Sequence, residues 1–379
     1  MSVIKKIVIY ILSALVPRGR VLLFTSVPDY TDNPYALFLY IIRNRTFFSD
    51  YAFVWMFSDK TRQQELEKRV LRDCPEVVFP KGRLQEWWYV LRARFVIYSH
   101  AFYNDYRFAQ NDKRINLWHG TGFKKVGVDN GETPARLDRL VTTNRVWQKY
   151  LAHSFAVSPE QVWVTGEPRT DLFFTPTDFF DLYGIDRCRY SSIGIWLPTF
   201  RKHNEEDRLD GVFDEYRLAG FSFDDLRELD DCLCASGGLL IVKLHIYDSL
   251  QNTAFPEFGN IVVLKQSDFR SQLYPLLGAT DYLLTDYSSV SFDYDILGRP
   301  MGFVLRDVND YRSTRGFYGD VDCIEDLLPG KVITTLEGLK DFVTDYKNCF
   351  VATGNRFNEY KDAGACKRVV EEMAKLVGR

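Results

Sequence analysis

The chain lacks the cysteine patterns of a disulfide-bonded or zinc-binding protein. Its 379 residues include seven cysteines, an odd number, and no two of them form a Cys-x-x-Cys pair. Neither a set of paired disulfides nor a structural zinc site is therefore expected. A reducing cytosol suits this sequence better than an oxidising compartment.

The signatures of two large classes of nucleotide-binding enzyme are also missing. The sequence has neither a P-loop nor a GxGxxG fingerprint, so an ATPase or an NAD-dependent dehydrogenase would lack its motif. Asp293 and Asp295 are the nearest approach to a carboxylate pair, but residues two apart on a helix point in different directions. We expect no metal, no cofactor and no nucleic-acid partner.

No apolar run is long enough to cross a bilayer, which takes about 20 residues. The strongest is Ile7–Val16, which follows Lys5 and Lys6. Arg18 and Arg20 stand where a signal peptide would have small cleavage-site residues. We expect an interfacial helix within residues 1–20, and a helix buried in the domain core is the alternative.

Positive charge is concentrated in the first third of the chain. Residues 1–125 hold 20 Lys/Arg against 11 Asp/Glu, a net charge of +9, and the remainder holds 28 against 40, a net charge of −12. An anionic membrane surface would attract the basic third, each nearby charge contributing roughly 1 kcal/mol. A solvated basic face without a partner explains the same pattern.

Short apolar runs alternate with helical patterns along the chain. This order predicts two doubly wound α/β domains with parallel sheets, facing a cleft at the carboxyl ends of their strands. We expect an N-terminal domain over 1–178, a C-terminal domain over 188–350, and a C-terminal helix within 355–379 that packs back. The expected strands are Val21–Thr25, Ala52–Phe57, Glu76–Phe79, Phe95–Ser99, Ile115–Trp118, Arg139–Thr142, Gln161–Val164, Ser192–Trp196, Gly238–Leu244, Ile261–Leu264, Tyr282–Leu284 and Pro300–Val304.

One candidate site follows the expected strand that ends at Trp118. The next residues are His119, Gly120 and Thr121, and Lys124 lies close behind. A strand that ends in Gly and Thr can present backbone N–H groups to an anion. His119 could accept a proton from an attacking hydroxyl, although a single histidine is more often a packed or exposed bystander.

A second candidate site lies in the other half, again at expected strand ends. Its residues are Arg201, Lys243, His245, Thr285, Asp286, Ser288 and Ser289. An arginine suits the paired oxygens of a diphosphate, and a strand-to-helix junction can receive phosphate. Helix capping by Asp286 or Ser288 is the simpler interpretation of the junction. Together with Arg201 and His245, a phosphate site is favoured.

These pieces together resemble the CDP-glycerol glycerophosphotransferase family of wall teichoic acid and capsule synthesis. The resemblance covers most of the chain and rests on several short motifs in a fixed order. They are Asp32-Asn33-Pro34, Trp118-His119-Gly120-Thr121, Gly166-Glu167-Pro168-Arg169-Thr170-Asp171, Pro198-Thr199-Phe200-Arg201, Lys243-Leu244-His245, Thr285-Asp286-Tyr287-Ser288-Ser289, Arg299-Pro300, Asp310-Tyr311 and Arg315-Gly316.

The resemblance implies a GT-B fold with the donor nucleotide in the C-terminal domain. It implies that His119 is the base and that His245, the second catalytic histidine, contacts the donor phosphate with Arg201, Ser288 and Ser289. Lys243, Thr285 and Asp286 are grouped with this donor site. Acceptor or structural roles fall to Gly120, Thr121, Lys124, Asp32, Asn33 and Arg169.

The implied reaction moves glycerol phosphate from CDP-glycerol to an undecaprenyl-diphosphate-linked glycan at the cytosolic face of the membrane, where the protein is peripheral. Gly122 and Ile246 stand where the family usually has proline, which leaves the polyol and the acceptor open. The short N-terminal region resembles the primase. Alternatives are a CDP-ribitol or capsule polymerase, a GT-B UDP-sugar enzyme and a non-catalytic membrane scaffold.

Overall fold

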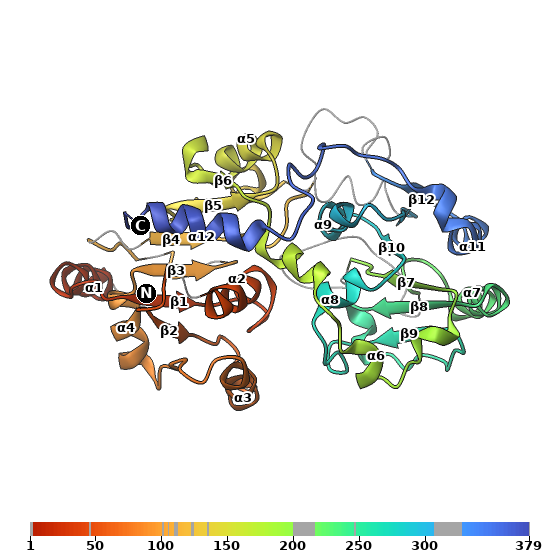
Figure 1. Ribbon diagram of the computed structural model, residues 1–379, viewed down its shortest axis with the longest axis horizontal. Coiled ribbons are helices and arrows are strands. Elements are labelled where there is room, and N and C mark those ends of the chain that lie inside the picture. The colour runs from red at the N-terminus through yellow and green to blue at the C-terminus, as the bar shows by residue number, and fades with distance from the viewer. Residues whose placement is uncertain are drawn as a thin grey trace. The chain divides into compact units, whose positions relative to one another are not determined.

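The computed structural model describes residues 3–378 except 45–46, 101, 105, 110–112, 123–124, 135, 200–216, 246–247 and 307–327. The chain divides into two compact units (Figure 1). Unit 1 comprises 1–121, 126–172 and 358–379, and unit 2 comprises 122–125 and 173–357. The expected fold class, with two parallel sheets flanked by helices, is confirmed.

Unit 1 is built on a parallel sheet in the order β2-β1-β3-β4-β5-β6. The strands are β1 Val21–Phe24, β2 Ala52–Trp55, β3 Phe95–Tyr98, β4 Lys113–Asn116, β5 Arg139–Thr142 and β6 Val162–Val164. The helices of this unit are α1 Val3–Leu15, α2 Asp32–Arg43, α3 Gln63–Asp73, α4 Arg83–Arg92, α5 Arg145–Ser154 and α12 Ala365–Lys375. Since β1 lies between β2 and β3, the connections change direction beside β1, and such a switch point commonly binds ligand.

Unit 2 repeats the design with the strand order β12-β11-β10-β7-β8-β9. Its strands are β7 Ser192–Trp196, β8 Gly238–Lys243, β9 Ile261–Leu264, β10 Tyr282–Thr285, β11 Met301–Val304 and β12 Lys331–Ile333. Its helices are α6 Phe179–Leu182, α7 Phe223–Ser236, α8 Leu273–Gly278, α9 Val290–Tyr294 and α11 Leu336–Asp345. Here the switch point lies between β7 and β10.

The sequence-based strands agree with the structure apart from two regions. The stretch Glu76–Phe79 contributes only an isolated bridge from Val78 to Val54 instead of a strand. The strand β12, by contrast, was not expected. The core of each unit consists of buried aliphatic and aromatic side chains from its sheet, such as Leu22 and Val96 in unit 1 and Leu240 and Leu284 in unit 2.

The last helix, α12, packs on α2 within unit 1. The Asp171 carboxylate accepts hydrogen bonds from the backbone N–H groups of Ala365 and Cys366, both at 2.9 Å. These contacts satisfy two N–H groups of the first turn, which have no partner within the helix. A chain that has passed through unit 2 thus returns to complete unit 1.

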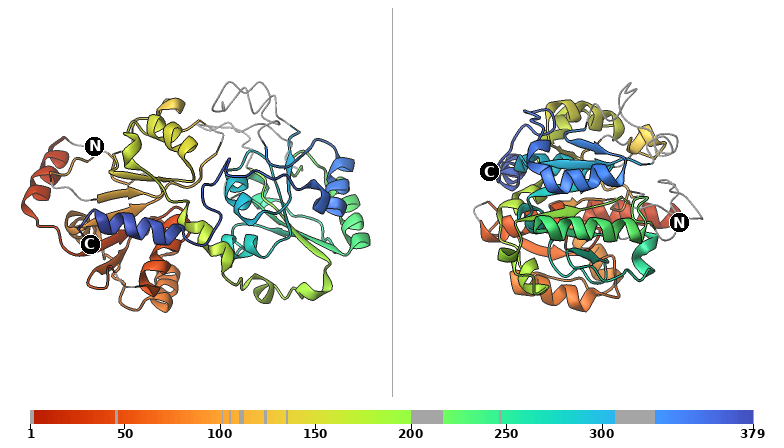
Figure 2. Two further views of the ribbon diagram at one scale, coloured as in Figure 1. Left: turned by 45° about the horizontal axis from the view of Figure 1, so that its top comes forward. Right: turned by 90° about the vertical axis from the view of Figure 1, so that its right-hand side faces the viewer.

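The first helix, α1, lies on the periphery of unit 1 (Figures 1 and 2). Only Ile9 and Ser13 of this helix are buried, and the Ser13 hydroxyl accepts a hydrogen bond from Ala109 N at 2.7 Å. The alternative of a helix buried in the core is therefore wrong. Among the described residues, no helix is both long and apolar enough to cross a membrane.

Candidate functional site

In unit 1 the His119 loop follows β4 and reaches the neighbouring strand β3. The ring of His119 stacks on that of His100, with centroids 4.1 Å apart and planes at 8°. Trp118 has a φ of 57°, which is unusual for a non-glycine residue, and its ring lies 3.9 Å from the His119 ring. The loop therefore holds the imidazole against two aromatic groups at the carboxyl end of the sheet.

The backbone of β3 fixes the tautomer of His119. Its Nδ1 lies 3.0 Å from the backbone oxygen of Ser99, and a carbonyl can only accept, so Nδ1 carries the hydrogen. Nε2 then keeps its lone pair. Burial is the main cause that lowers the pKa of His119 from 6.5, against smaller opposing effects of Ser99 and Asp32. A neutral imidazole with a free Nε2 can act as a base.

Five residues from distant parts of unit 1 form a buried polar network beneath this loop. The Glu167 side chain, fully buried, accepts from Thr121 N at 2.9 Å, from Thr121 Oγ1 at 3.2 Å and from Asn33 Nδ2 at 3.3 Å. Arg169 pairs with Glu167 at 2.8 Å and with Asp32 at 2.7 Å. A buried charge needs such partners, so replacing one residue of the network would leave a buried polar group of another without its partner.

The network also contacts the loop backbone directly. Asn33 Nδ2 donates to the backbone oxygens of Leu117 and Trp118 at 3.0 and 3.1 Å, and Asn33 Oδ1 accepts from Arg169 N at 2.9 Å. Arg169 Nη1 donates to the His119 backbone oxygen at 3.0 Å. Asp32, Asn33, Thr121 and Arg169 thus come together and position His119. Gly120, with a φ of 138°, completes the loop.

Glu167 and His100 were not among the expected site residues. Glu167 stands inside the quoted Gly-Glu-Pro-Arg motif, so its signal was available. His100 had a weaker signal, because its contact with His119 can be predicted only when the strand that pairs with β3 is known. The pairing of β3 with β4, Tyr98 opposite Asn116, brings the two histidines together.

In unit 2 the expected residues Thr285 and Asp286 lie at the switch point between β7 and β10. Thr285 Oγ1 donates to the Leu197 backbone oxygen at 2.8 Å. Asp286 accepts from the backbone N and the hydroxyl of Thr199, at 2.9 and 2.7 Å. Asp286 thus ties the β7 loop to the β10 loop, and the N-cap position of α9 is taken by Ser289.

The two serines lie at the start of the short helix α9. Both are half-buried, and Ser288 Oγ accepts from Val290 N at 3.4 Å. Ser289 is the N-cap residue, but its side chain makes no capping hydrogen bond. Among the described residues the Ser289 hydroxyl has no hydrogen-bond partner, so it can contact a ligand.

Lys243 is the last residue of β8, which lies next to β7 in the sheet, and His245 follows that strand. Lys243 Nζ lies 3.2 Å from Gln266 Oε1 and 5.0 Å from the centroid of the Phe269 ring. Burial lowers the pKa of Lys243 to about 8. Gln251 Nε2 donates to the His245 backbone oxygen at 2.7 Å and holds this turn. Arg201 and Lys124 lie outside the described residues.

A metal centre finds no support in the part of the chain that the structure describes, which contains no group of three or more His, Cys, Asp or Glu side chains suited to a metal ion. The two carboxylates of α9 and the turn after it are used structurally. Tyr274 Oη donates to Asp293 at 2.5 Å, and the Thr353 hydroxyl donates to Asp295.

Solved structures share the two-domain fold. The wall teichoic acid polymerase TagF superposes with a TM-score of 0.68 at 20% identity, covering 99% of this chain and 97% of that one. The UDP-GlcNAc 2-epimerase from Neisseria meningitidis superposes with a TM-score of 0.54 at 14% identity, covering 94% and 100%. The likeness identifies a GT-B fold, as expected.

Curated relatives are more informative. A teichoic acid poly(ribitol-phosphate) polymerase of Bacillus spizizenii is 28% identical over 70% of this chain and 43% of its own length. A teichoic acid poly(glycerol phosphate) polymerase of the same organism is 24% identical over 97% and 95%. The chain therefore spans less than half of some relatives and nearly all of others.

The family comparison covers almost the whole chain. A sequence model described as CDP-Glycerol:Poly(glycerophosphate) glycerophosphotransferase matches residues 8–375. This stretch contains every motif named above, including the His119 loop, the buried network and the serine pair. The chain belongs to the CDP-glycerol:poly(glycerophosphate) glycerophosphotransferase family.

Proposed function

We propose that this protein transfers glycerol phosphate from CDP-glycerol to a hydroxyl of a lipid-linked glycan and releases CMP. The observation that carries the proposal is His119, whose Nδ1 donates to Ser99 O and whose pKa is lowered by burial. A family whose reaction needs a hydroxyl nucleophile fits a histidine that is neutral and has a fixed tautomer.

The proposed step balances with the groups that the chain and its substrates supply. The acceptor hydroxyl attacks the phosphorus that bears the glycerol, and an oxygen–phosphorus bond forms. The bond from that phosphorus to the bridging oxygen breaks, and CMP leaves with the electron pair. The hydroxyl proton passes to Nε2 of His119. Positioning and charge stabilisation supply most of the catalysis in such transfers.

Unit 2 is the proposed donor site. Among the described residues the Ser289 hydroxyl, beside Ser288 at the switch point, has no hydrogen-bond partner, and Lys243 ends the neighbouring strand β8. Hydroxyl, ammonium and backbone N–H groups together suit a diphosphate. On the family resemblance we assign His245 and Arg201 to the same donor phosphates. These roles rest on the family motifs and on the place of the motifs at the carboxyl edge of the sheet.

A peripheral position on the cytosolic membrane face is part of the proposal. Eight large apolar residues of α1 are exposed, namely Val3, Ile4, Ile7, Val8, Tyr10, Ile11, Leu12 and Leu15. A contiguous apolar face of this kind marks an interaction surface. The bilayer is a fitting partner because the proposed acceptor is anchored in it and the surrounding third of the chain is basic.

Ribitol is the second candidate polyol. The relatives include poly(ribitol-phosphate) polymerases as well as poly(glycerol phosphate) polymerases, and both donors share the CDP group. A glycerol-phosphate primase of Bacillus subtilis is also similar, 26% identical over 70% of this chain and 68% of its own length. We propose the primase reaction, with a single addition, as the first to test.

The decisive experiment incubates the protein with CDP-glycerol or CDP-ribitol and a synthetic lipid-linked disaccharide, and identifies products by mass spectrometry. One glycerol phosphate per acceptor is expected, with one CMP released. His119→Ala should lower kcat by about 10²-fold or more, and His153→Ala, at an exposed histidine, is the control. Turnover of UDP-sugars without transfer from either CDP-polyol would refute the proposal.

A further inference from the structure

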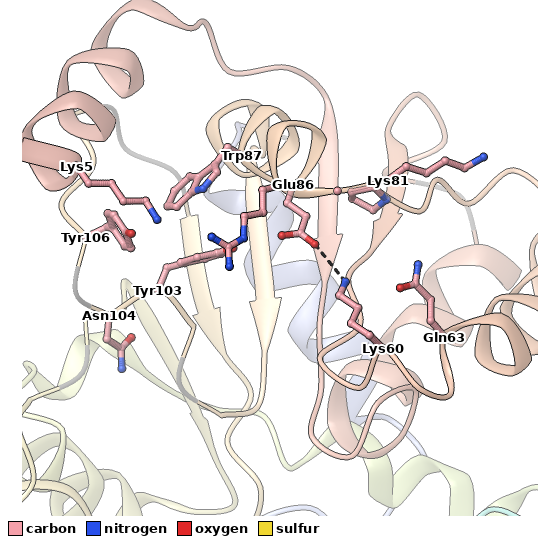
Figure 3. Close-up of a pocket in the computed structure, with 12 residues that line it drawn as sticks. Lys5, Lys60, Gln63, Lys81, Glu86, Trp87, Tyr103, Asn104 and Tyr106 are labelled. Carbon is pink, nitrogen blue, oxygen red and sulfur yellow. Dashed lines mark hydrogen bonds and ion pairs between the residues drawn. The ribbon is translucent and has the colours of Figure 1, made fainter. Parts of the chain in front are cut away.

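A large pocket of unit 1 has no role in the proposed donor or base sites. Its volume is about 1060 Å³, and it lies between α1, α4 and the loops that follow β2 and β3 (Figure 3). Its walls are basic and aromatic. The lining residues used below are Lys5, Lys60, Arg83, Trp87, Tyr103 and Asn104.

The charge of the pocket favours an anion. Four cations line it, with Lys81 besides Lys5, Lys60 and Arg83, against the single carboxylate of Glu86. The Glu86 carboxylate forms an ion pair with Lys60, with Nζ and Oε1 3.1 Å apart, as Figure 3 shows. In the described part of the chain the other three cations form no ion pair, so their charge is available to a ligand.

The aromatic side of the pocket favours a ring with hydroxyl groups. Trp87 packs against Tyr103 and Tyr106, with ring centroids 4.7 and 4.8 Å away. Asn104 Oδ1 is buried and has no hydrogen-bond partner among the described residues. A buried acceptor without a partner is costly, and a rotation of the Asn104 side chain toward the pocket would let a sugar hydroxyl satisfy it. Phosphate alone uses neither the aromatic wall nor this oxygen.

The position of the pocket links the proposed base to the membrane-facing helix. The loop after β3 contains His100, which stacks on His119, and also Tyr103 and Asn104 in the pocket wall. On the other side, Lys5 of α1 points its ammonium group toward Trp87, 6.0 Å from the ring centroid (Figure 3). The pocket thus adjoins the apolar face of α1.

We infer that this pocket binds the diphosphate and the first sugar of the lipid-linked acceptor. The inference rests on the proposed function and assigns the acceptor headgroup to a place of its own. The cations bind the diphosphate, and the aromatic rings and Asn104 bind the sugar. The lipid chain extends along α1. A glycosyl diphosphate carried on a lipid uses all three features.

The test measures acceptor affinity in a variant of the pocket. The probe is a soluble short-chain prenyl diphosphate disaccharide, titrated calorimetrically into the full-length protein with no membrane present. Lys81→Gln with Arg83→Gln removes two exposed cations that have no ion-pair partner among the described residues, and should weaken binding about tenfold because two charged partners are lost. The matched control, Lys68→Gln with Arg189→Gln, changes exposed residues outside the pocket and should bind within about twofold of wild type.

Further ligands distinguish the glycosyl diphosphate from free diphosphate and from anionic lipid headgroups. The disaccharide without diphosphate and inorganic pyrophosphate should each bind more weakly than the intact probe, and vesicles of phosphatidylglycerol should not compete with it. Equal probe affinity in both double variants, or full competition by phosphatidylglycerol, would overturn the inference.

Failure of the pocket inference is distinguishable from failure of the proposed function. If wild-type protein transfers glycerol phosphate but the pocket variant keeps the wild-type KM for the acceptor, only the pocket assignment is wrong. If neither protein transfers from a CDP-polyol, the proposed function is wrong. CDP affinity serves as the internal reference, since donor binding is assigned to unit 2 and should not change in the pocket variant.

Discussion

The guanidinium of Arg169 donates a hydrogen bond to the backbone oxygen of His119 at 3.0 Å. The same side chain is paired with Glu167 at 2.8 Å and with Asp32 at 2.7 Å, and it is almost completely buried. The backbone of the proposed base is therefore anchored to an ion-pair network that spans three segments of unit 1. Changes in that network should affect both stability and catalysis.

Glu167→Gln tests the network. The carboxylate accepts four hydrogen bonds, two of them from Thr121, and the glutamine NH₂ would face donors where an acceptor is needed. We expect the free energy of unfolding to fall by about 2–4 kcal/mol, since one partner of a buried pair is lost. Urea unfolding measures it, with exposed Glu257→Gln as the control. An unchanged midpoint in both variants would show that the network contributes nothing.

The pH dependence of catalysis should follow His119. The imidazolium cannot accept a proton, so kcat/KM should fall as pH drops through the His119 pKa, which burial places below 6.5. The unfolded chain binds this proton at about 6.5, so stability should also decrease as pH falls below that value. A pH–rate profile whose acid limb lies clearly above 6.5 would contradict the assignment.

The sequence predicted the strands well because most are isolated apolar runs bounded by polar residues. The bounds of β5, β7 and β9 agree to the residue. In contrast, Glu76–Phe79 has the same composition as a strand but only Val78 finds a partner. The sequence does not predict the strand β12, because it has only three residues and begins with a lysine. Pairing depends on neighbours that local composition does not reveal.

The site was predictable to the extent that it lies within continuous motifs. The His119 loop and the Thr285–Ser289 segment each form one run of sequence. Glu167 also lies in a continuous motif, but its role as an acceptor for Asn33 was not predictable, because Asn33 lies 134 residues away and no local pattern indicates that contact. The pocket beside α4 likewise draws its cations from three separate segments. Such constellations depend on the topology of the sheet.

Lys243→Met should separate binding from stability. Burial lowers the pKa of Lys243 to about 8, so folding disfavours its charged form, and methionine removes that cost while keeping the volume. We expect unfolding free energy to stay the same or rise by about 1 kcal/mol. CDP affinity should fall because a positive charge is lost.

The CDP affinity of the wild-type protein should vary with pH, because pH sets the charge of Lys243. Below about 8 the ammonium form of Lys243 predominates, and above that value the group is neutral, so affinity should decrease as pH rises. Calorimetry at several pH values measures this trend. In Lys243→Met the trend should disappear, and its persistence would assign the titration to another group.

Activity should survive EDTA, although at a reduced rate. The described residues contain no metal-binding group of His, Cys, Asp or Glu, and the donor charge can be met by cations, hydroxyls and N–H groups. CMP release is measured before and after chelation, with Mg²⁺ added back. Complete loss of activity that Mg²⁺ restores would reveal a metal requirement that the donor diphosphate or undescribed residues meet.

The apolar face of α1 should bind the bilayer, and its basic surroundings should strengthen that binding. Ile7 and Ile11 are 53% and 51% exposed, so Ile7→Asn with Ile11→Asn should leave unfolding unchanged while liposome binding falls several-fold. Wild-type protein should sediment with anionic liposomes at low salt and partly release at high salt, because salt screens charge but not apolar insertion. Val146→Asn on α5, 57% exposed, is the control and should sediment like wild type. Equal binding of the wild type to neutral and anionic vesicles would contradict the electrostatic part, and no binding at all would leave the exposed face of α1 to another partner.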